Sequence, residues 1–215
     1  FIWLPSEDPS EQVAGMARFH DLAACTDALP DTSLQSTDLL QIVYTSGTES
    51  SPKGAMLTHG NMLSNAVMLK DYWGWTATGG PDGKGDVLIH ALPIFHVHGL
   101  FVAIHGALLN GSKMLWHGKF DPKKVIADLP RATVFMGVPT LYVRMLAEPA
   151  LTKQQAAHMR LFISGSAPLS ATAADAFVHA TGHAILERYG MSETGMLCSN
   201  PCRASEGARL PGSVG

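Results

Sequence analysis

A polar loop follows the first strongly apolar run of the chain. Residues 45–54 read TSGTESSPKG, and they lie between the apolar run 39–44 and a segment with a helical pattern. Backbone N–H groups, small hydroxyl side chains and a lysine ammonium group can all approach phosphate oxygens closely. We therefore predict that this loop binds the phosphates of a nucleotide and that Lys53 supplies positive charge there.

The loop differs from the Walker type of phosphate loop. A Walker loop ends in Gly-Lys-Ser/Thr, whereas here Lys53 precedes Gly54. The order Thr-Ser-Gly-Thr followed by Pro-Lys-Gly resembles instead the phosphate loop of the adenylate-forming superfamily, which includes acyl-CoA synthetases and luciferases. That family usually has Thr-Gly where this chain has Glu49 and Ser50. The resemblance implies that ATP is bound here by Thr45, Ser46, Gly47, Thr48, Lys53 and Gly54.

Two histidines follow the apolar run 87–92. The segment 93–100 reads PIFHVHGL, which places His96 and His98 at a strand-to-helix junction. A His-x-His pair can bind a metal ion, but no carboxylate pattern nearby completes a ligand set, so a packed or substrate-lining role is favoured. The segment resembles the gate motif of acyl-CoA synthetases. This resemblance implies that both histidines border the carboxylate that is activated.

A run of small residues follows another apolar segment. Residues 164–169 read SGSAPL, and small side chains leave room for a flat ring against the backbone. A tight turn that merely needs Gly165 explains the spacing equally well. The run resembles the family segment that packs against adenine, with Ser166 also at the edge of the acyl pocket. The nucleotide contacts implied here are Ser164, Gly165, Ser166, Ala167 and Pro168.

An acidic motif lies further along the chain. Residues 187–195 read ERYGMSETG, with Glu193 between the hydroxyls of Ser192 and Thr194. Such oxygen-rich groups hold Mg²⁺ against phosphate, although a solvated helix start with an acidic residue is the alternative. The motif resembles the family's Tyr-Gly-x-Thr-Glu. The resemblance implies Mg²⁺ binding by Glu193 with Thr45, catalytic roles for Lys53, Ser192 and Glu193, and nucleotide contacts from Glu187, Arg188, Tyr189, Gly190, Met191 and Ser192.

Two arginines suggest the substrate. Guanidinium groups bind carboxylates bidentately, so Arg144 and Arg188 facing one acyl pocket would select an acid with a second carboxylate. Each arginine by itself is also consistent with a surface or structural role. The surrounding segments ATVFMGVPTLYVRML and TGHAILERYGMSET resemble malonyl-CoA synthetases. The acyl pocket that this implies consists of His96, His98, Arg144, Ser166, Arg188 and Met191.

Short apolar runs alternate with helical patterns throughout the chain from residue 38 onward. This alternation predicts an α/β fold with a largely parallel sheet flanked by helices, and ligands bind at the carboxyl ends of such strands. The resemblance implies part of the N-terminal domain of an adenylate-forming enzyme. The predicted strands are 39–44, 87–92, 113–116, 133–136, 160–163 and 184–187, and the predicted helices start near 59, 97, 122, 140 and 170.

Two regions are expected along the chain. Residues 1–37 carry scattered prolines and acids, and they predict an irregular lead-in with one short helix around 11–24. Residues 38–215 are expected to form an ATP- and acyl-binding α/β subdomain. The chain starts at Phe1 without methionine and ends in LPGSVG, which suggests a piece of a longer protein without the family's C-terminal catalytic domain. We therefore expect weak nucleotide binding, if any, and negligible turnover from these residues alone.

Composition narrows the class of protein. A hydrophobic fraction of 46%, 15% charged residues and a net charge of −3 describe a globular protein without a basic face for nucleic acid. The longest apolar stretch, 99–109, is too short to span a membrane. Cys25, Cys198 and Cys202 fit neither a disulfide framework nor a metal site and are expected to be reduced thiols. We expect a cytoplasmic protein.

The resemblance implies an ATP-dependent acid–thiol ligase. It would activate malonate or methylmalonate as an acyl-adenylate with Mg²⁺ and transfer the acyl group to coenzyme A. A serine hydrolase is disfavoured, because Thr194 replaces the glycine of a nucleophile elbow around Ser192 and neither Asp nor His follows. Another short- or medium-chain acyl-CoA synthetase and a non-catalytic nucleotide-binding paralogue remain as alternatives.

Overall fold

The computed structural model describes residues 2–3, 17–18, 33–45, 51–77, 83 and 85–215. The chain divides into two compact units, 1–34 and 35–215. In the first unit, strands β1 (Ile2–Trp3) and β2 (Ala17–Arg18) pair in parallel. The helix predicted around 11–24 is therefore wrong at residues 17–18, and the rest of that prediction lies outside the described residues.

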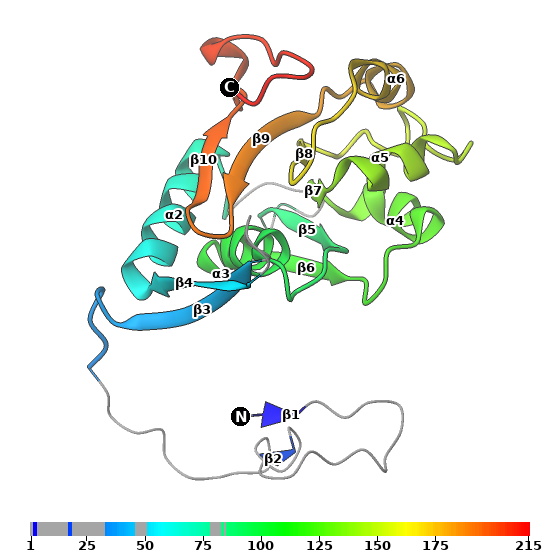
Figure 1. The fold of residues 1–215 in the computed structure, drawn as a ribbon. Coiled ribbons are helices and arrows are strands. Elements are labelled where there is room, and N and C mark those ends of the chain that lie inside the picture. Colours follow the sequence, from blue (N-terminus) through cyan, green and yellow to red (C-terminus); the bar gives the residue numbers. More distant parts are fainter. Residues whose placement is uncertain (1, 4–16, 19–32, 46–50, 78–82, 84) are drawn as a thin grey trace. The chain divides into compact units, whose positions relative to one another are not determined.

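The second unit is built on a largely parallel sheet (Figure 1). Within the described residues this sheet has six strands in the order β10-β9-β8-β7-β5-β6, of which only the β10–β9 pair is antiparallel. The strands are β5 (Val87–His90), β6 (Lys113–Trp116), β7 (Val134–Gly137), β8 (Leu161–Ser164), β9 (Leu186–Met191) and β10 (Gly195–Ser199). The predicted largely parallel sheet is confirmed, whereas β10 was not predicted.

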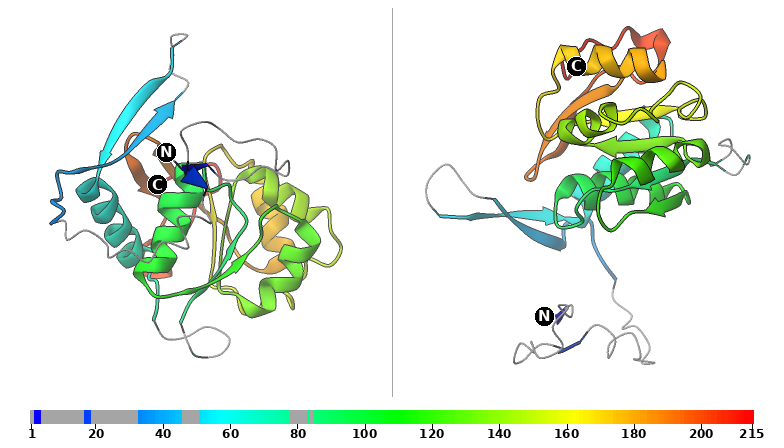
Figure 2. Two further views of the ribbon diagram at one scale, coloured as in Figure 1. Left: turned by 90° about the horizontal axis from the view of Figure 1, so that it is seen from below. Right: turned by 90° about the vertical axis from the view of Figure 1, so that its right-hand side faces the viewer.

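Helices cover both faces of this sheet (Figure 2). Their starts follow local capping rules: Asp121 accepts hydrogen bonds from the N–H groups of Lys123 and Lys124 with Pro122 in the first turn, and Ser170 accepts one from Ala173. The helices are α2 (His59–Tyr72), the π-helix η1 (His98–Ile104), α3 (His105–Leu109), α4 (Pro122–Asp128), η2 (Leu129–Arg131), α5 (Pro139–Leu146), α6 (Ala171–Thr181) and η3 (Ala204–Glu206).

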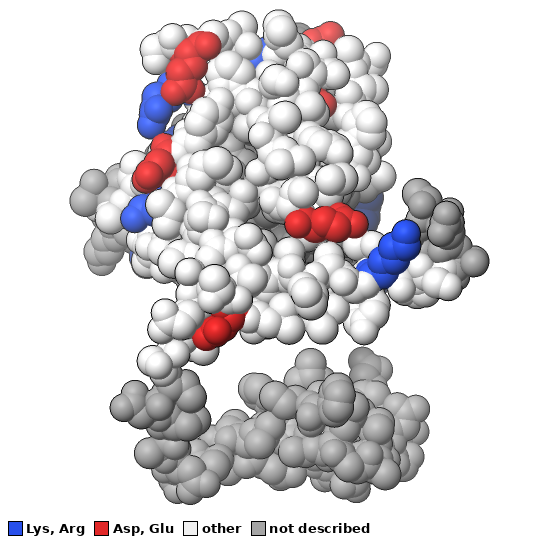
Figure 3. Space-filling view, turned by 60° about the vertical axis from the view of Figure 1, so that its left-hand side comes forward, with Lys and Arg blue, Asp and Glu red and all other residues white. Residues whose placement is uncertain are grey.

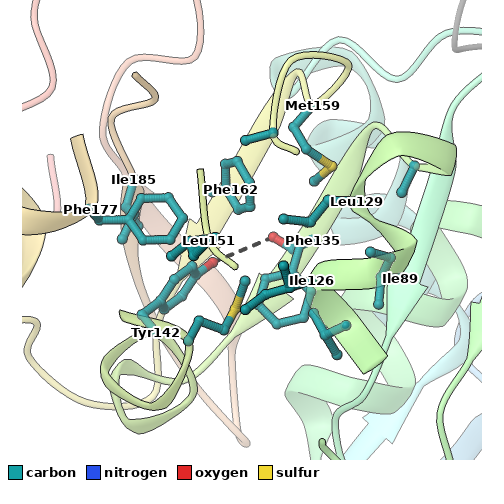
Figure 4. Close-up of a cluster of buried hydrophobic side chains, with 14 of the residues drawn as sticks. Ile89, Ile126, Leu129, Phe135, Tyr142, Leu151, Met159, Phe162, Phe177 and Ile185 are labelled. Atoms are coloured by element: carbon teal, nitrogen blue, oxygen red, sulfur yellow. Dashed lines mark hydrogen bonds between the residues drawn. The ribbon is translucent and has the colours of Figure 1, made fainter. Parts of the chain in front are cut away.

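The core lies on both sides of the sheet because successive side chains of a strand point to opposite faces. Phe135 and Phe162 pack with Tyr142 of α5 and Phe177 of α6 in edge-to-face contacts (Figure 4). The alternate strand residues pack on the other side, in a second cluster with α2 and η1. Burial on both faces explains why these strands are nearly continuous apolar runs in the sequence.

The segment around the predicted phosphate loop forms a separate β-ribbon. Strand β3 (Leu39–Thr45) pairs antiparallel with β4 (Lys53–Thr58), and neither strand belongs to the parallel sheet (Figure 2). The expected order of strand, loop and helix is therefore wrong, because a second strand comes between the loop and α2. The ribbon exposes large side chains, with Tyr44 72% and Met56 71% exposed.

Candidate active site

A small cavity brings together residues from three predicted motifs. It has a volume of about 180 Å³ and lies between the segments that follow β5 and β8 and the last residues of β9. Parallel pairing sets this edge of the sheet, since Ser164 is in register with Gly137 on one side and with Glu187 on the other. The cavity is lined by His96, Val97, His98, Ser166, Arg188, Gly190, Met191, Ser192 and Met196.

Arg188 is buried at this cavity with unmet hydrogen-bonding capacity. Its side chain comes from β9, the residue is 3% exposed, and in the described part of the chain its Nε and Nη2 atoms have no hydrogen-bond partner. Burial lowers the pKa of the guanidinium to about 10, so Arg188 still carries its charge at neutral pH. A buried cation with two unpaired donors favours a bound anion.

His98 lies beside Arg188 at the start of η1. Its Nδ1 is 3.3 Å from Oγ of Ser166, within hydrogen-bond distance, and its buried Nε2 has no partner among the described residues. Burial lowers the pKa of His98 well below the usual value, and the charge of Arg188 lowers it further. Ser166 holds a left-handed backbone conformation with φ of 69°, which is uncommon outside glycine and often marks functional sites.

A larger cavity adjoins the small one. It has a volume of about 670 Å³, and His96, His98 and Ser166 line both cavities. Its other walls are mostly apolar and include Trp116 and Phe120, which sequence reasoning did not assign to a site. The sequence could have indicated Trp116 as a site residue, because it is the last residue of a parallel strand and ligands bind at that end of such strands.

Glu193 lies next to this site but not in the small cavity. It is exposed in the turn between β9 and β10, and it lines a depression of about 320 Å³ against α2. Met196 lines both this depression and the small cavity. Among the described residues no group of three or more His, Cys, Asp or Glu could hold a metal ion. Glu193 still fits Mg²⁺, because that ion commonly takes one or two carboxylates plus nucleotide oxygens.

Only some of the predicted phosphate-loop residues belong to the described part of the chain. Ser46, Gly47 and Thr48 lie outside the described residues, Thr45 ends β3, and Lys53 and Gly54 are exposed at the start of β4. Lys53 lines neither the small cavity nor the depression at Glu193. In the described part of the chain, Ser166 and Glu193 therefore line adjoining pockets, and Lys53 lines neither of them.

The predicted adenine-contacting residues differ in their surroundings. Ser164 is buried and its Oγ has no partner in the described part of the chain, whereas Ala167 and Pro168 are exposed. Glu187 is buried, and its Oε1 accepts a hydrogen bond of 2.7 Å from the N–H of Gly212. The Glu187 carboxylate is thus engaged by the chain itself. Tyr189 and Met191 are exposed, and Gly190 is half-buried.

Arg144 and Arg188 do not face the same pocket. Arg144 is exposed on α5, with its Cζ 4.8 Å from the centre of the Phe120 ring, and it lines a surface depression with Lys123 and Glu148. The two arginines line different pockets here, and the predicted role of Arg144 at the acyl pocket stays a prediction. Helical periodicity gives the reason, because α5 turns Tyr142 and Met145 to the core and Arg144 outward.

A family model described as AMP-binding enzyme matches residues 4–215. The chain belongs to the AMP-binding enzyme family. This AMP-binding enzyme chain is 37% identical over 190 residues to the mitochondrial malonate–CoA ligase of Homo sapiens, an alignment that covers 81% of the chain and 31% of the human protein.

Solved structures of similar proteins agree with this membership. ATP-bound MatB from Rhodopseudomonas palustris is 51% identical with a TM-score of 0.81, over 90% of this chain and 36% of MatB. A malonyl-CoA ligase in a ternary product complex with methylmalonyl-CoA and AMP is 34% identical with a TM-score of 0.82, over 96% of this chain and 45% of that one. They confirm the predicted fold, that of adenylate-forming enzymes.

This member of the AMP-binding enzyme family spans only part of the length of its relatives. It covers 31% of the human ligase and 36% of MatB. No helix in the described part of the chain has the length and apolar character needed to cross a bilayer. On the face shown in Figure 3, the charged side chains are scattered and most of the surface is uncharged.

Proposed function

We propose that the protein is an AMP-forming acid–thiol ligase that activates malonate or methylmalonate and transfers the acyl group to coenzyme A. The observation that carries this proposal is the buried guanidinium of Arg188 at the small cavity, whose Nε and Nη2 have no hydrogen-bond partner among the described residues. Support also comes from relatives whose names state malonate–CoA ligase activity and from a relative that binds methylmalonyl-CoA and AMP.

The cavity favours a short acid with a second carboxylate. A carboxylate beside Arg188 compensates the buried charge and supplies acceptors for its free donors, and such charge-assisted bonds are stronger than neutral ones. A volume of about 180 Å³ matches the size of an acid with a few heavy atoms. His98 and Ser166 offer further polar contacts in the same cavity.

Two steps follow from this assignment. An oxygen of the reacting carboxylate attacks the α-phosphorus of ATP, which forms the acyl-adenylate and releases pyrophosphate. The thiolate sulfur of coenzyme A then attacks the acyl carbon, the bond between that carbon and the phosphate oxygen breaks, and AMP leaves. Orientation and neutralisation of charge account for most of the rate enhancement in phosphoryl chemistry of this kind, so the protein acts chiefly by positioning the reactants.

The roles of individual residues are part of the proposal. Lys53, Ser46 and Thr48 would neutralise the β- and γ-phosphates, Thr45 would face the AMP part, and Ser192 would contact the α-phosphate. Glu193 would hold Mg²⁺, which supplies charge neutralisation on the phosphates when bound. Residues 38–215 are assigned as the ATP- and acyl-binding part. A cytoplasmic location stays a prediction, because the human relative is named as mitochondrial.

The test is acid-dependent exchange of pyrophosphate into ATP by the full-length protein. We compare malonate, methylmalonate, acetate and octanoate with wild type, Arg188→Ala and a control, Arg131→Ala, whose side chain is 69% exposed. Arg188→Ala is expected to lower kcat/KM for malonate by about a hundredfold, as for the loss of a buried charge-assisted contact, while the value for acetate changes little. Arg131→Ala is expected to behave like wild type.

Other outcomes would select the alternatives. The apolar cavity of about 670 Å³ favours a larger acid, and wild type that prefers octanoate to malonate would be a short- or medium-chain acyl-CoA synthetase. Wild type that binds ATP but exchanges pyrophosphate with none of the acids would be a non-catalytic paralogue. Malonate use that survives Arg188→Ala unchanged would remove the role assigned to Arg188.

A further inference from the structure

Asn65 of α2 holds the backbone of β10 through its side-chain amide. Its Nδ2 donates a hydrogen bond of 3.1 Å to the carbonyl oxygen of Met196, and its Oδ1 accepts one of 3.2 Å from the N–H of the same residue. The amide therefore bonds Met196 in both directions, as a neighbouring strand would. Figure 1 shows α2 running alongside β10.

The same amide lies against the end of the turn that carries Glu193. Gly195, the residue before Met196, has φ of +68°, and a Cβ atom there would lie 2.7 Å from Oδ1 of Asn65. On its other side, the turn is closed by a hydrogen bond of 3.3 Å from the N–H of Thr194 to the carbonyl oxygen of Met191. Asn65 thus fixes the point at which the chain leaves the turn.

Helix α2 links this turn to the strand that contains Lys53. The helix begins directly after β4, where Thr58 accepts a hydrogen bond from the N–H of Asn61. Its far end is also attached to β10, because Tyr72 donates a hydrogen bond of 3.4 Å to the carbonyl oxygen of Ser199. The helix is therefore attached to two segments with proposed roles in ATP binding.

We propose that Asn65 is a positioning residue that holds the turn of Glu193 in the place required for Mg²⁺·ATP. This inference rests on the proposed function, in which Glu193 holds the ion. Mg²⁺ demands nearly ideal octahedral geometry, and Glu193 is exposed on a short turn, so its position depends on what anchors the turn. Residues that orient a metal ligand typically change metal affinity by about 10- to 100-fold when they are replaced.

The experiment measures metal binding directly in the full-length protein. Mn²⁺ replaces Mg²⁺ as the probe, and its binding in the presence of a non-hydrolysable ATP analogue is followed by electron paramagnetic resonance. Asn65→Leu keeps the approximate size of the side chain and removes both hydrogen bonds, and Asn65→Ala is a smaller change for the case in which Asn65→Leu does not fold. Both variants are expected to bind Mn²⁺ about 10- to 100-fold more weakly.

Two further readouts separate positioning from a general loss of structure. Hydrogen exchange of the Met196 amide is expected to become faster in both variants, whereas the KM for malonate stays unchanged. The matched control is Tyr72→Phe, which removes a hydrogen bond between the same helix and the same strand at the end remote from Glu193. This control is expected to bind Mn²⁺ like wild type.

The results that overturn the inference are distinct from those that overturn the function. Normal Mn²⁺ binding by Asn65→Ala, an unchanged exchange rate at Met196, or equal weakening by Tyr72→Phe would each remove the positioning role, with malonate activation intact in wild type. Wild type that binds no Mn²⁺ with the ATP analogue would contradict the proposed function, and the inference with it.

Discussion

The guanidinium of Arg188 rests directly on the backbone of Gly165. A Cβ atom at Gly165 would lie 2.5 Å from Nε of Arg188 and closer still to Cζ, so no other residue fits here without moving the arginine. Gly165 lies in the turn after β8 and Arg188 in β9. Contact with the Arg188 guanidinium thus explains why the SGSAPL segment has a glycine at position 165, whether or not a flat ring also binds nearby.

Gly165→Ala is expected to displace Arg188 and weaken the binding of malonate. The added methyl group requires a shift of Arg188, because its closest neighbours are the guanidinium atoms themselves. We expect the KM for malonate to rise by about tenfold or more, as for one impaired contact to a charged group, in steady-state assays of the full-length protein. Gly118→Ala is the control, since a Cβ atom there meets no atom within 4 Å. Equal effects of the two changes would contradict this explanation.

Tyr142→Phe is expected to destabilise the fold by about 1 kcal/mol, the usual net value of one buried hydrogen bond. The phenol is fully buried in the cluster of Figure 4, where the dashed line joins its hydroxyl to the carbonyl oxygen of Phe135. The shorter hydrogen bond of this hydroxyl, of 2.6 Å, goes to the carbonyl oxygen of Ile163. Urea unfolding followed by circular dichroism measures the difference in the free energy of unfolding. An unchanged transition midpoint would show that this hydrogen bond contributes nothing.

Asp86 is expected to make stability depend on pH in the acid range. Burial alone would raise the pKa of Asp86, but hydrogen bonds from Arg160, Thr133 and the Thr76 N–H, with the charge of Arg160, lower it below the usual 3.8. The carboxyl is therefore harder to protonate in the folded state. The ionised Asp86 therefore stabilises the folded state fully above pH 3.8. This stabilisation is lost as the pH falls through the lower pKa of Asp86 in the folded protein.

The measurement compares wild type with Asp86→Asn in urea at about pH 7 and about pH 3. The Arg160 guanidinium donates bonds of 3.1 and 2.9 Å to the two carboxylate oxygens, and Asp86 is 1% exposed. We expect the variant to lose about 3 kcal/mol at neutral pH, as for a broken buried ion pair, and to lose less on acidification than wild type. Parallel losses in both proteins would assign the acid sensitivity to other groups.

The 215-residue chain by itself is expected to bind ATP weakly or not at all. It covers 36% of ATP-bound MatB, so most residues of that relative lie outside the matched part. Titration of ATP and Mg²⁺ into the isolated chain by calorimetry tests this expectation. Tight binding together with formation of a malonyl thioester by this chain would refute it.

Much of the fold could be predicted because its signals are local. Strand β6 occupies the residues expected, and α4 begins where Asp121 and Pro122 indicated, since a cap depends only on neighbours in the sequence. Strand β4 was missed because KGAMLT is short and acquires its strand conformation by pairing with β3. The structure now gives the positions of the described site residues, whereas their roles in binding and catalysis remain proposals.

The sequence by itself determined the alternation of strands and helices, the family, and the order of the polar motifs, because these depend on residue types and on spacing along the chain. Only the tertiary structure decided that Arg188 lies buried on Gly165 and that Arg144 is exposed at a different pocket. It also decided that Asn65 holds Met196, at a separation of 131 residues. Such contacts arise when distant segments pack together, and no local pattern specifies which polar groups then meet.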